Sequence, residues 1–174
     1  MGKFHENLYL IAAVDENWAL GSEGDLLFRI PDDLTLNFKA KTLGQIVIMG
    51  RATFESLPGK KPLPDRVNVV LSRRLKMTDS ANVLICNTLA ALWPIIEGNR
   101  DRRIFVAGGA SVYQQLLPYC ALAYITKIMA IRPADRRMAD LDQEREWELI
   151  GQSPVRTHEN LRYYYATYKN IANQ

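Results

Sequence analysis

Short apolar runs alternate with stretches of helical periodicity through the first two thirds of the chain, and apolar runs alone fill the last third. A short apolar run is typical of a buried strand, whereas apolar positions three and four residues apart indicate a helix. The pattern predicts strands at residues 8–14, 46–49, 67–72, 83–86, 104–107, 122–129, 146–153 and 162–169. It predicts helices at residues 31–43, 51–57, 89–97 and 111–117.

The order of these elements predicts the fold class. Strands joined through helices pair in parallel, whereas consecutive strands with short connections pair antiparallel. We therefore predict an α/β fold with a mostly parallel central sheet of about eight strands, an antiparallel C-terminal edge and helices on both faces. At 174 residues the chain is expected to form a single domain, with a core at about residues 8–169.

Composition excludes several classes of protein. A net charge of +3 is too small for a protein committed to nucleic acid, whose affinity depends on many phosphate contacts. The two cysteines, Cys86 and Cys120, and the two histidines, His5 and His158, are not at metal-ligand spacing, so no metal site is expected. The apolar run at residues 8–14 is too short to span a bilayer. We expect a cytoplasmic protein with no membrane or nucleic-acid partner.

Groups that bind phosphate follow three of the predicted strands. They are Gly50-Arg51-Ala52-Thr53, Ser72-Arg73-Arg74 and Gly108-Gly109-Ala110-Ser111. In an open parallel sheet the ligand crevice lies at the carboxyl ends of the strands. Glycines there let the backbone approach a phosphate, and arginines bind its oxygens in pairs. Taken singly, a Gly-Gly pair is more often a plain turn and an arginine a surface charge, but their recurrence at one sheet edge indicates a dinucleotide, and adjacent arginines suit the 2′-phosphate of NADPH.

Six segments together resemble the dihydrofolate reductase family. They are residues 10–14 (LIAAV), 31–34 (PDDL), 47–57 (VIMGRATFESL), 62–66 (PLPDR), 69–73 (VVLSR) and 108–113 (GGASVY), in the order and near the spacing of the family, whose bacterial members they resemble. The resemblance implies NADPH-dependent reduction of 7,8-dihydrofolate to 5,6,7,8-tetrahydrofolate for one-carbon metabolism. Hydride would pass from the nicotinamide to C6 of the pterin, with a proton at N5. It also implies a monomer that binds antifolate inhibitors.

The resemblance assigns site residues by position. Asp33 matches the carboxylate that pairs with the pterin, Thr126 the hydroxyl that supports it, and Arg66 the arginine that binds the glutamate tail of folate. Further substrate positions are Ile11, Val14, Leu26, Leu27, Phe28, Leu34, Phe38, Leu57, Leu63, Ala107 and Tyr113. Cofactor positions are Ala13, Leu20, Gly21, Gly50, Arg51, Ala52, Thr53, Leu71, Ser72, Arg73, Arg74, Gly108, Gly109, Ala110, Ser111 and Val112. Residues 21–27 match the loop that covers the nicotinamide, and Asp135 matches the acid that braces it.

The chain departs from the family pattern near the expected acid. Asp33 and Phe38 are five positions apart, where the family has four, which implies an inserted residue, a bulge, or the use of Asp32 instead. Phe28 stands where many bacterial relatives have tryptophan, and Leu27 replaces the usual proline. Residues 136–139 replace an aromatic-proline pair. Gly108-Gly109-Ala110 replaces three glycines and still permits the cis bond expected between the first two.

Two other functions remain open. A reductase of the same fold could act on another pyrimidine or pteridine, as in the riboflavin pathway, although it would have no reason to keep Arg66 and an acid after Pro31. A protein that binds folate or a nucleotide without turnover is favoured only by the extra residue after Asp33.

Overall fold

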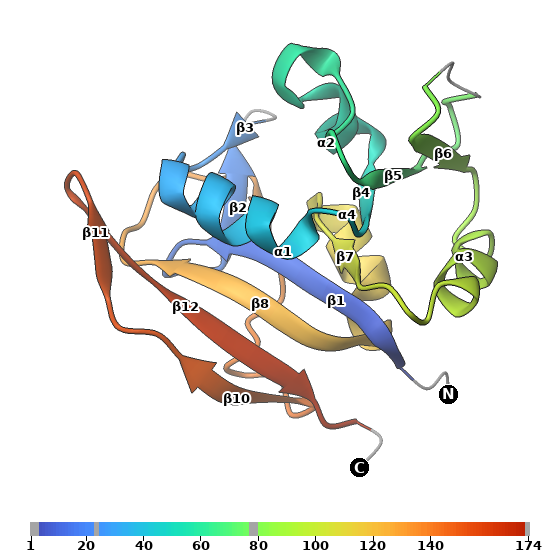
Figure 1. Ribbon diagram of the computed structural model, residues 1–174. Helices are drawn as coiled ribbons and strands as arrows, with labels where there is room; N and C mark the ends of the chain where they lie inside the picture. Colours follow the sequence, from blue (N-terminus) through green and yellow to red (C-terminus); the bar gives the residue numbers. More distant parts are fainter. Residues whose placement is uncertain (1–3, 23–24, 77–79, 173–174) are drawn as a thin grey trace.

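The computed structural model describes residues 4–22, 25–76 and 80–172, and Figure 1 shows a twisted central sheet flanked by helices. The sheet has nine strands, in the order β10-β12-β8-β1-β7-β4-β5-β6 with β11 paired to β12. Its strands are β1 (His5–Val14), β4 (Ile46–Gly50), β5 (Val67–Leu71), β6 (Val83–Cys86), β7 (Ile104–Val106), β8 (Cys120–Ile128), β10 (Trp147–Gln152), β11 (Arg156–His158) and β12 (Leu161–Asn170).

The pairing confirms the predicted fold class. All neighbours from β8 to β6 are parallel. The C-terminal strand β12 runs antiparallel to β8, and β10 and β11 run antiparallel to β12. A second sheet of three short strands, β2 (Ala19–Ser22), β3 (Asp25–Leu26) and β9 (Arg136–Arg137), was not predicted. These strands, like β11, contain no continuous apolar run such as those of the central strands, so the sequence pattern gave no signal for them.

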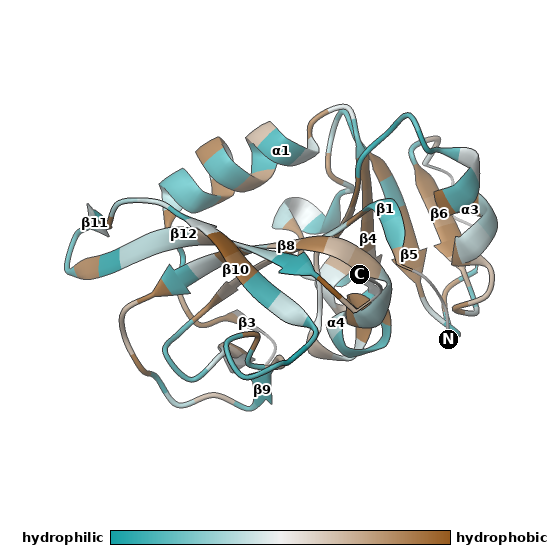
Figure 2. Cartoon of the chain, turned by 90° about the horizontal axis from the view of Figure 1, so that it is seen from below, coloured by the Kyte–Doolittle hydropathy of each residue, from teal (hydrophilic) through white to brown (hydrophobic). Residues whose placement is uncertain are grey.

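Alternate residues of the central strands face two apolar layers. In β4, Ile46 and Ile48 pack in a cluster with helix residues such as Leu92 and Leu116, whereas Val47 and Met49 pack in another. The helical segments are a π-helix, η1 (Asp33–Lys39), and then α1 (Ala40–Thr42), α2 (Arg51–Glu55), η2 (Pro58–Lys60), α3 (Leu92–Gly98), α4 (Ala110–Leu116) and η3 (Leu117–Tyr119). Figure 2 shows α1 on one side of the sheet and α4 on the other, as predicted.

Two helices differ from their predicted form. The helix expected at residues 89–97 begins at Leu92, although the Thr88 hydroxyl still accepts a hydrogen bond from the Ala91 amide at 3.2 Å. The helix expected at residues 31–43 is a π-helix over Asp33–Lys39 that continues into the short α1. None of the helices in the described ranges is long and apolar enough to cross a membrane.

Candidate active site

A cavity of about 380 Å³ opens at the carboxyl ends of β1, β4, β7 and β8, the edge where the sequence predicted a ligand. Its walls include many of the predicted substrate positions: Ile11, Leu26, Phe28, Asp33, Leu34, Phe38, Leu57, Leu63, Arg66, Ala107, Tyr113 and Thr126. They also include the predicted cofactor positions Ala13, Leu20, Ala52, Thr53, Gly108, Gly109 and Ala110. The fold thus brings residues from segments far apart in the sequence to one concave surface.

Asp33 is the buried acid of this cavity. Its side chain is 8% exposed, whereas Asp32 lies on the surface, so the structure places Asp33 and not Asp32 at the site. The Thr126 hydroxyl donates a hydrogen bond to Asp33 Oδ1 at 2.6 Å, and Asn37 Nδ2 donates to the same oxygen at 3.0 Å. Burial raises the pKa of the Asp33 carboxyl, and these two bonds oppose the rise because they favour the charged form.

The π-helix accounts for the unusual spacing between the acid and Phe38. In an α-helix, a residue five positions on lies about 140° around the axis and faces away from the first. The wider π-helical turn, with hydrogen bonds from i to i+5, brings it back to the same side. Asp33 and Phe38 therefore both line the cavity despite the extra residue.

The turn after β7 packs closely against the turn after β4. The peptide bond between Gly108 and Gly109 is cis, as the family resemblance implied, and Gly108 has a φ of 123°, which favours glycine. The Gly50 amide donates to the Gly108 carbonyl at 2.8 Å. Tyr113 donates its hydroxyl to the Ile11 carbonyl at 2.7 Å, and burial followed by the nearby Asp33 charge raises the pKa of Tyr113 far above its usual range.

Arg66 lies in the cavity wall at only 6% exposure. Its Nε donates to the Pro64 carbonyl at 2.9 Å and its Nη1 to the Thr42 hydroxyl at 3.2 Å. Burial lowers the pKa of this guanidinium, while the Asp65 charge acts in the opposite direction. Within the described ranges no carboxylate forms an ion pair with Arg66, so a buried cation faces the cavity with neutral partners only.

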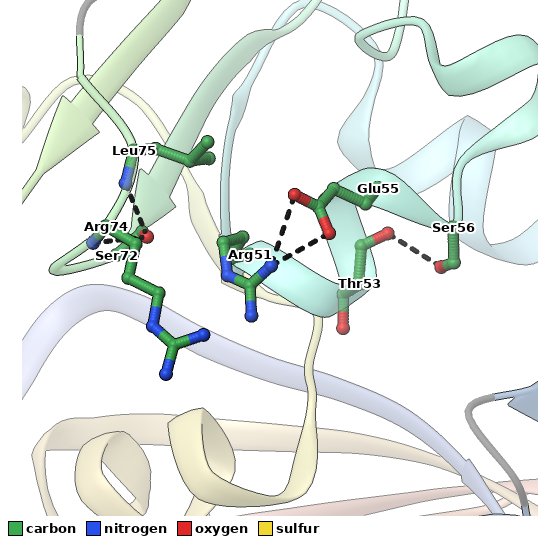
Figure 3. Close-up of polar contacts among 7 residues, drawn as sticks. All are labelled: Arg51, Thr53, Glu55, Ser56, Ser72, Arg74 and Leu75. Carbon is green, nitrogen blue, oxygen red and sulfur yellow. Dashed lines mark hydrogen bonds and ion pairs between the residues drawn. The ribbon is translucent and has the colours of Figure 1, made fainter.

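The remaining predicted cofactor residues lie outside the cavity wall. Figure 3 shows the turn after β5, where the Ser72 hydroxyl oxygen accepts hydrogen bonds from the amides of Arg74 and Leu75 at 3.2 and 3.1 Å. It also shows Arg51 paired with Glu55 at 3.1 Å along α2. The predicted cofactor positions outside the wall are Gly21, Gly50, Arg51, Leu71, Ser72, Arg73, Arg74, Ser111 and Val112.

Two predicted substrate residues are not brought to the cavity. Val14 packs in the main core, because alternate residues of a strand face opposite sides and Val14 shares the side of Leu8 and Leu10 rather than that of Ile11. Leu27 packs in the cluster of Phe28 and Ile30, which line the cavity, but it is not itself in the wall. Its carbonyl accepts a hydrogen bond from Arg132 Nη1 at 2.7 Å. Neither side chain lines this cavity, and their assignment to the substrate pocket stays a prediction.

Other wall residues were missed from the sequence. Ile30, Met49, Pro58 and Ile128 are apolar positions that a core would equally need, so they carried no distinct signal. The polar or charged wall residues Arg29, Asn37, Lys39, Ser56 and Arg136 look like surface positions in the sequence. Of these, Arg136 was noticed only as a departure from the family pattern.

The connection before β9 meets the loop that was expected to cover the nicotinamide. The Asp135 amide donates to the Gly21 carbonyl at 3.1 Å, and β9 pairs with β2. The backbone of Asp135 makes this contact, and the bracing expected of Asp135 stays a prediction. Residues 23 and 24 of the expected loop lie outside the described ranges.

Comparison with known proteins identifies the family. A family model described as dihydrofolate reductase matches residues 7–170. The chain belongs to the dihydrofolate reductase family. It is 40% identical over 131 residues to the dihydrofolate reductase of Drosophila melanogaster, covering 69% of this chain and 72% of that protein. It is 36% identical over 141 residues to that of Bacillus subtilis, covering 81% and 80%.

A solved family structure has the same architecture. It is the dihydrofolate reductase of Enterococcus faecalis complexed with NADP(H) and RAB-propyl, with a TM-score of 0.80 and 30% sequence identity. The match covers 98% of this chain and 99% of that one. The family resemblance and the fold class predicted from the sequence are thus confirmed.

Proposed function

We propose that this chain reduces 7,8-dihydrofolate to 5,6,7,8-tetrahydrofolate with NADPH, with Asp33 as the acid that orients and polarises the pterin. The single observation that carries the proposal is a buried carboxylate, held by Thr126, at the bottom of a largely apolar cavity. Membership of the dihydrofolate reductase family supports the assignment. The activity would supply reduced folate for one-carbon metabolism.

The residues at the edge of the sheet fit a dinucleotide. A Cβ built on Gly108 or Gly109 would make an ordinary contact, 3.5 Å, with the Thr53 hydroxyl oxygen, so it is the positive φ of Gly108 that favours glycine at this turn. Arg73 and Arg74 are exposed at the end of β5, where guanidinium groups can bind the 2′-phosphate of NADPH. When bound, NADPH supplies the hydride.

Asp33 recognises the amino edge of the pterin and supplies a negative charge next to the ring. Oδ1 already accepts bonds from Thr126 and Asn37, so Oδ2 is the oxygen that can accept from the amino edge of a pterin. A buried negative charge next to the ring stabilises a proton on it, because the low-polarity walls weaken the attraction only slightly. Apolar side chains such as Ile11, Leu57 and Phe38 can exclude water from the reacting rings.

Arg66 supplies the second anchor. A buried guanidinium with neutral partners gains most from a carboxylate that arrives with the substrate, and bidentate pairing fixes its orientation. A site with an acid for the pterin edge and a cation for the tail selects folates over smaller pyrimidines. This pair of groups disfavours a reductase of the same fold that acts on a riboflavin precursor.

The extra residue after Asp33 no longer favours a protein without turnover. The π-helix keeps both Asp33 and Phe38 at the cavity, so the inserted residue does not move either side chain away from the site.

We also propose that the chain acts as a single-domain monomer in the cytoplasm and that antifolates compete with dihydrofolate for the cavity. Sedimentation of the purified chain tests the monomer, and inhibition patterns against dihydrofolate test the competition.

The deciding experiment is the loss of NADPH absorbance in the presence of dihydrofolate. We expect turnover with dihydrofolate and none with an amino-pyrimidine that lacks the glutamate tail. Binding of NADPH and dihydrofolate with no turnover would instead support a binding protein. Turnover of the pyrimidine alone would support the other reductase.

A further inference from the structure

Asn37 contacts the buried acid from the π-helix. It is half-buried, and its Nδ2 donates to Asp33 Oδ1 at 3.0 Å. Asn37 lines the substrate cavity and also a second pocket of about 110 Å³, together with Lys41, Tyr124 and Tyr165. It therefore lies between the acid and a second, smaller hollow on the other side.

The π-helix is what makes this contact compatible with the rest of the site. In the wider π-helical turn, the residues four and five positions after Asp33 lie on the same side of the helix as Asp33, one to each side of it. Asn37 and Phe38 therefore both face the cavity. In a regular α-helix the residues three and four positions on lie beside the acid, and the residue five positions on does not. The extra residue thus adds an amide donor to the site without removing the aromatic wall.

Both protein donors to the Asp33 carboxylate bind the same oxygen. Thr126, from β8, and Asn37, from the helix, both donate to Oδ1. Within the described ranges Oδ2 accepts no hydrogen bond from the protein. Two donors from different elements fix the plane of the carboxylate. With one donor alone, the carboxylate could still rotate about the Cβ–Cγ bond.

We propose that Asn37 is a positioning residue for the reaction, which holds the Asp33 carboxylate so that Oδ1 is satisfied by the protein and Oδ2 faces the pterin. The inference rests on the proposed function, because it assigns a task to the carboxylate of that site. Asn37 itself need not touch the reacting atoms.

The electrostatic surroundings of Asp33 agree with this role. The bond from Asn37 favours the charged carboxylate and so lowers its pKa against the larger effect of burial. Tyr113, from α4, and Tyr165, from β12, are the nearby titratable groups, and burial raises the pKa of both, to about 12 for Tyr165, so they stay neutral at working pH. The cationic groups in the same cavity wall are Arg29, Lys39, Arg66 and Arg136.

The test replaces Asn37 by leucine, which has similar size and no donor. In the full chain without ligand, the titration of the Asp33 carboxyl carbon, followed by ¹³C NMR, should move to higher pH, because the charged form loses a hydrogen bond. With dihydrofolate and NADPH, kcat should fall roughly tenfold, the lower end of what a hydrogen bond to a charged group contributes. The Kd for NADPH should stay at the wild-type value.

Thr35→Val is the matched control. Thr35 lies on the same π-helix and bonds the Pro31 carbonyl at 2.8 Å on the exposed side, so its loss removes a helix hydrogen bond without touching Asp33. Both the titration and kcat of this variant should match the wild type. If Asn37→Leu matches Thr35→Val in both measurements, the proposal is overturned.

A second variant covers the case in which leucine disturbs the fold. Asn37→Ala removes the same donor with the residue of best helix propensity, and the same upward titration shift and lower kcat are expected. An unchanged titration in folded Asn37→Ala would contradict the role of Asn37. If the wild-type chain fails to reduce dihydrofolate while the Asn37→Leu titration still shifts, the proposed function is overturned and the control of Asp33 by Asn37 is supported.

Discussion

Asp33→Asn separates the chemistry of the site from the stability of the fold. Asparagine has nearly the same shape as aspartate, and its side-chain oxygen can still accept from Thr126 and Asn37. The substitution therefore removes the negative charge and replaces Oδ2, the oxygen that faces the pterin, by an amide donor, with little change in shape. It should reduce turnover sharply while leaving the fold and NADPH binding intact.

The loss of rate follows from the missing charge. Support of a proton in the transition state by a positioned side chain contributes about 10²–10⁴-fold, which corresponds to roughly 2.7–5.5 kcal/mol. At neutral pH we expect a loss of kcat in this range. The deficit should shrink about tenfold for each unit of falling pH, because substrate already protonated in solution no longer needs the carboxylate.

The same substitution should make the fold more stable at neutral pH. The pKa of Asp33 is raised in the folded state, chiefly by burial. The folded protein then binds more protons than the unfolded chain between the ordinary carboxyl pKa, near 3.8, and the raised value, so stability falls as pH rises through that window. Each unit of elevation corresponds to about 1.4 kcal/mol of stability that the charged form lacks.

Two measurements test the predicted effects of Asp33→Asn on rate and on stability. Rates of NADPH oxidation with saturating dihydrofolate, compared between Asp33→Asn and wild type across pH, test the chemistry, and denaturant unfolding of the ligand-free proteins tests the stability. The gain in unfolding free energy should disappear at acid pH, where wild-type Asp33 is itself protonated. A rate deficit that does not change with pH, or a variant less stable than wild type at neutral pH, would refute the reasoning.

Three further predictions concern the rest of the site. Arg66→Leu should raise the KM for dihydrofolate roughly tenfold or more with NADPH affinity nearly unchanged, and equal losses for both ligands would indicate a structural role. Replacing Arg73 and Arg74 by glutamine should weaken NADPH binding by about tenfold to a hundredfold and spare NADH, as measured by titration; equal affinities for the two cofactors in the wild type would contradict this. In Gly50→Ala the added Cβ would lie 3.1 Å from Val112 Cγ2, so a cost of about 1–3 kcal/mol is expected in unfolding, and Val112→Ala in the same chain should relieve it.

The sequence predicted the central sheet well because most of its strands contain continuous apolar runs. The strand at Val83–Cys86 has the bounds that the pattern predicted, and the order of strands and helices implied the parallel pairing that β1 makes with β7 and β8. Short strands such as β2 and β9 form only because tertiary contacts bring their backbones together. Two-residue strands leave no periodic signal for a sequence pattern to detect.

The sequence also indicated the kind of ligand, through glycines and arginines after three strands and through the family motifs. It could not place individual side chains around the cavity. Val14 seemed equivalent to Ile11 until the strand fixed which side each residue faces. Arg136 reaches the cavity from β9, more than a hundred residues after β1 in the chain, and only the folded chain brings the two together.

The acid of the site shows most clearly what the sequence determines and what the tertiary structure determines. The sequence by itself determined that an aspartate follows Pro31 at the start of a helix, and left Asp32 and Asp33 as alternatives. The tertiary structure buries Asp33 beside Thr126 and leaves Asp32 exposed, and the π-helical path keeps Phe38 on the side of Asp33. Whether the helix takes the wider π turn depends on how the residues packed around it accommodate the extra residue. Those residues come from distant parts of the chain, so the local sequence alone does not determine the turn.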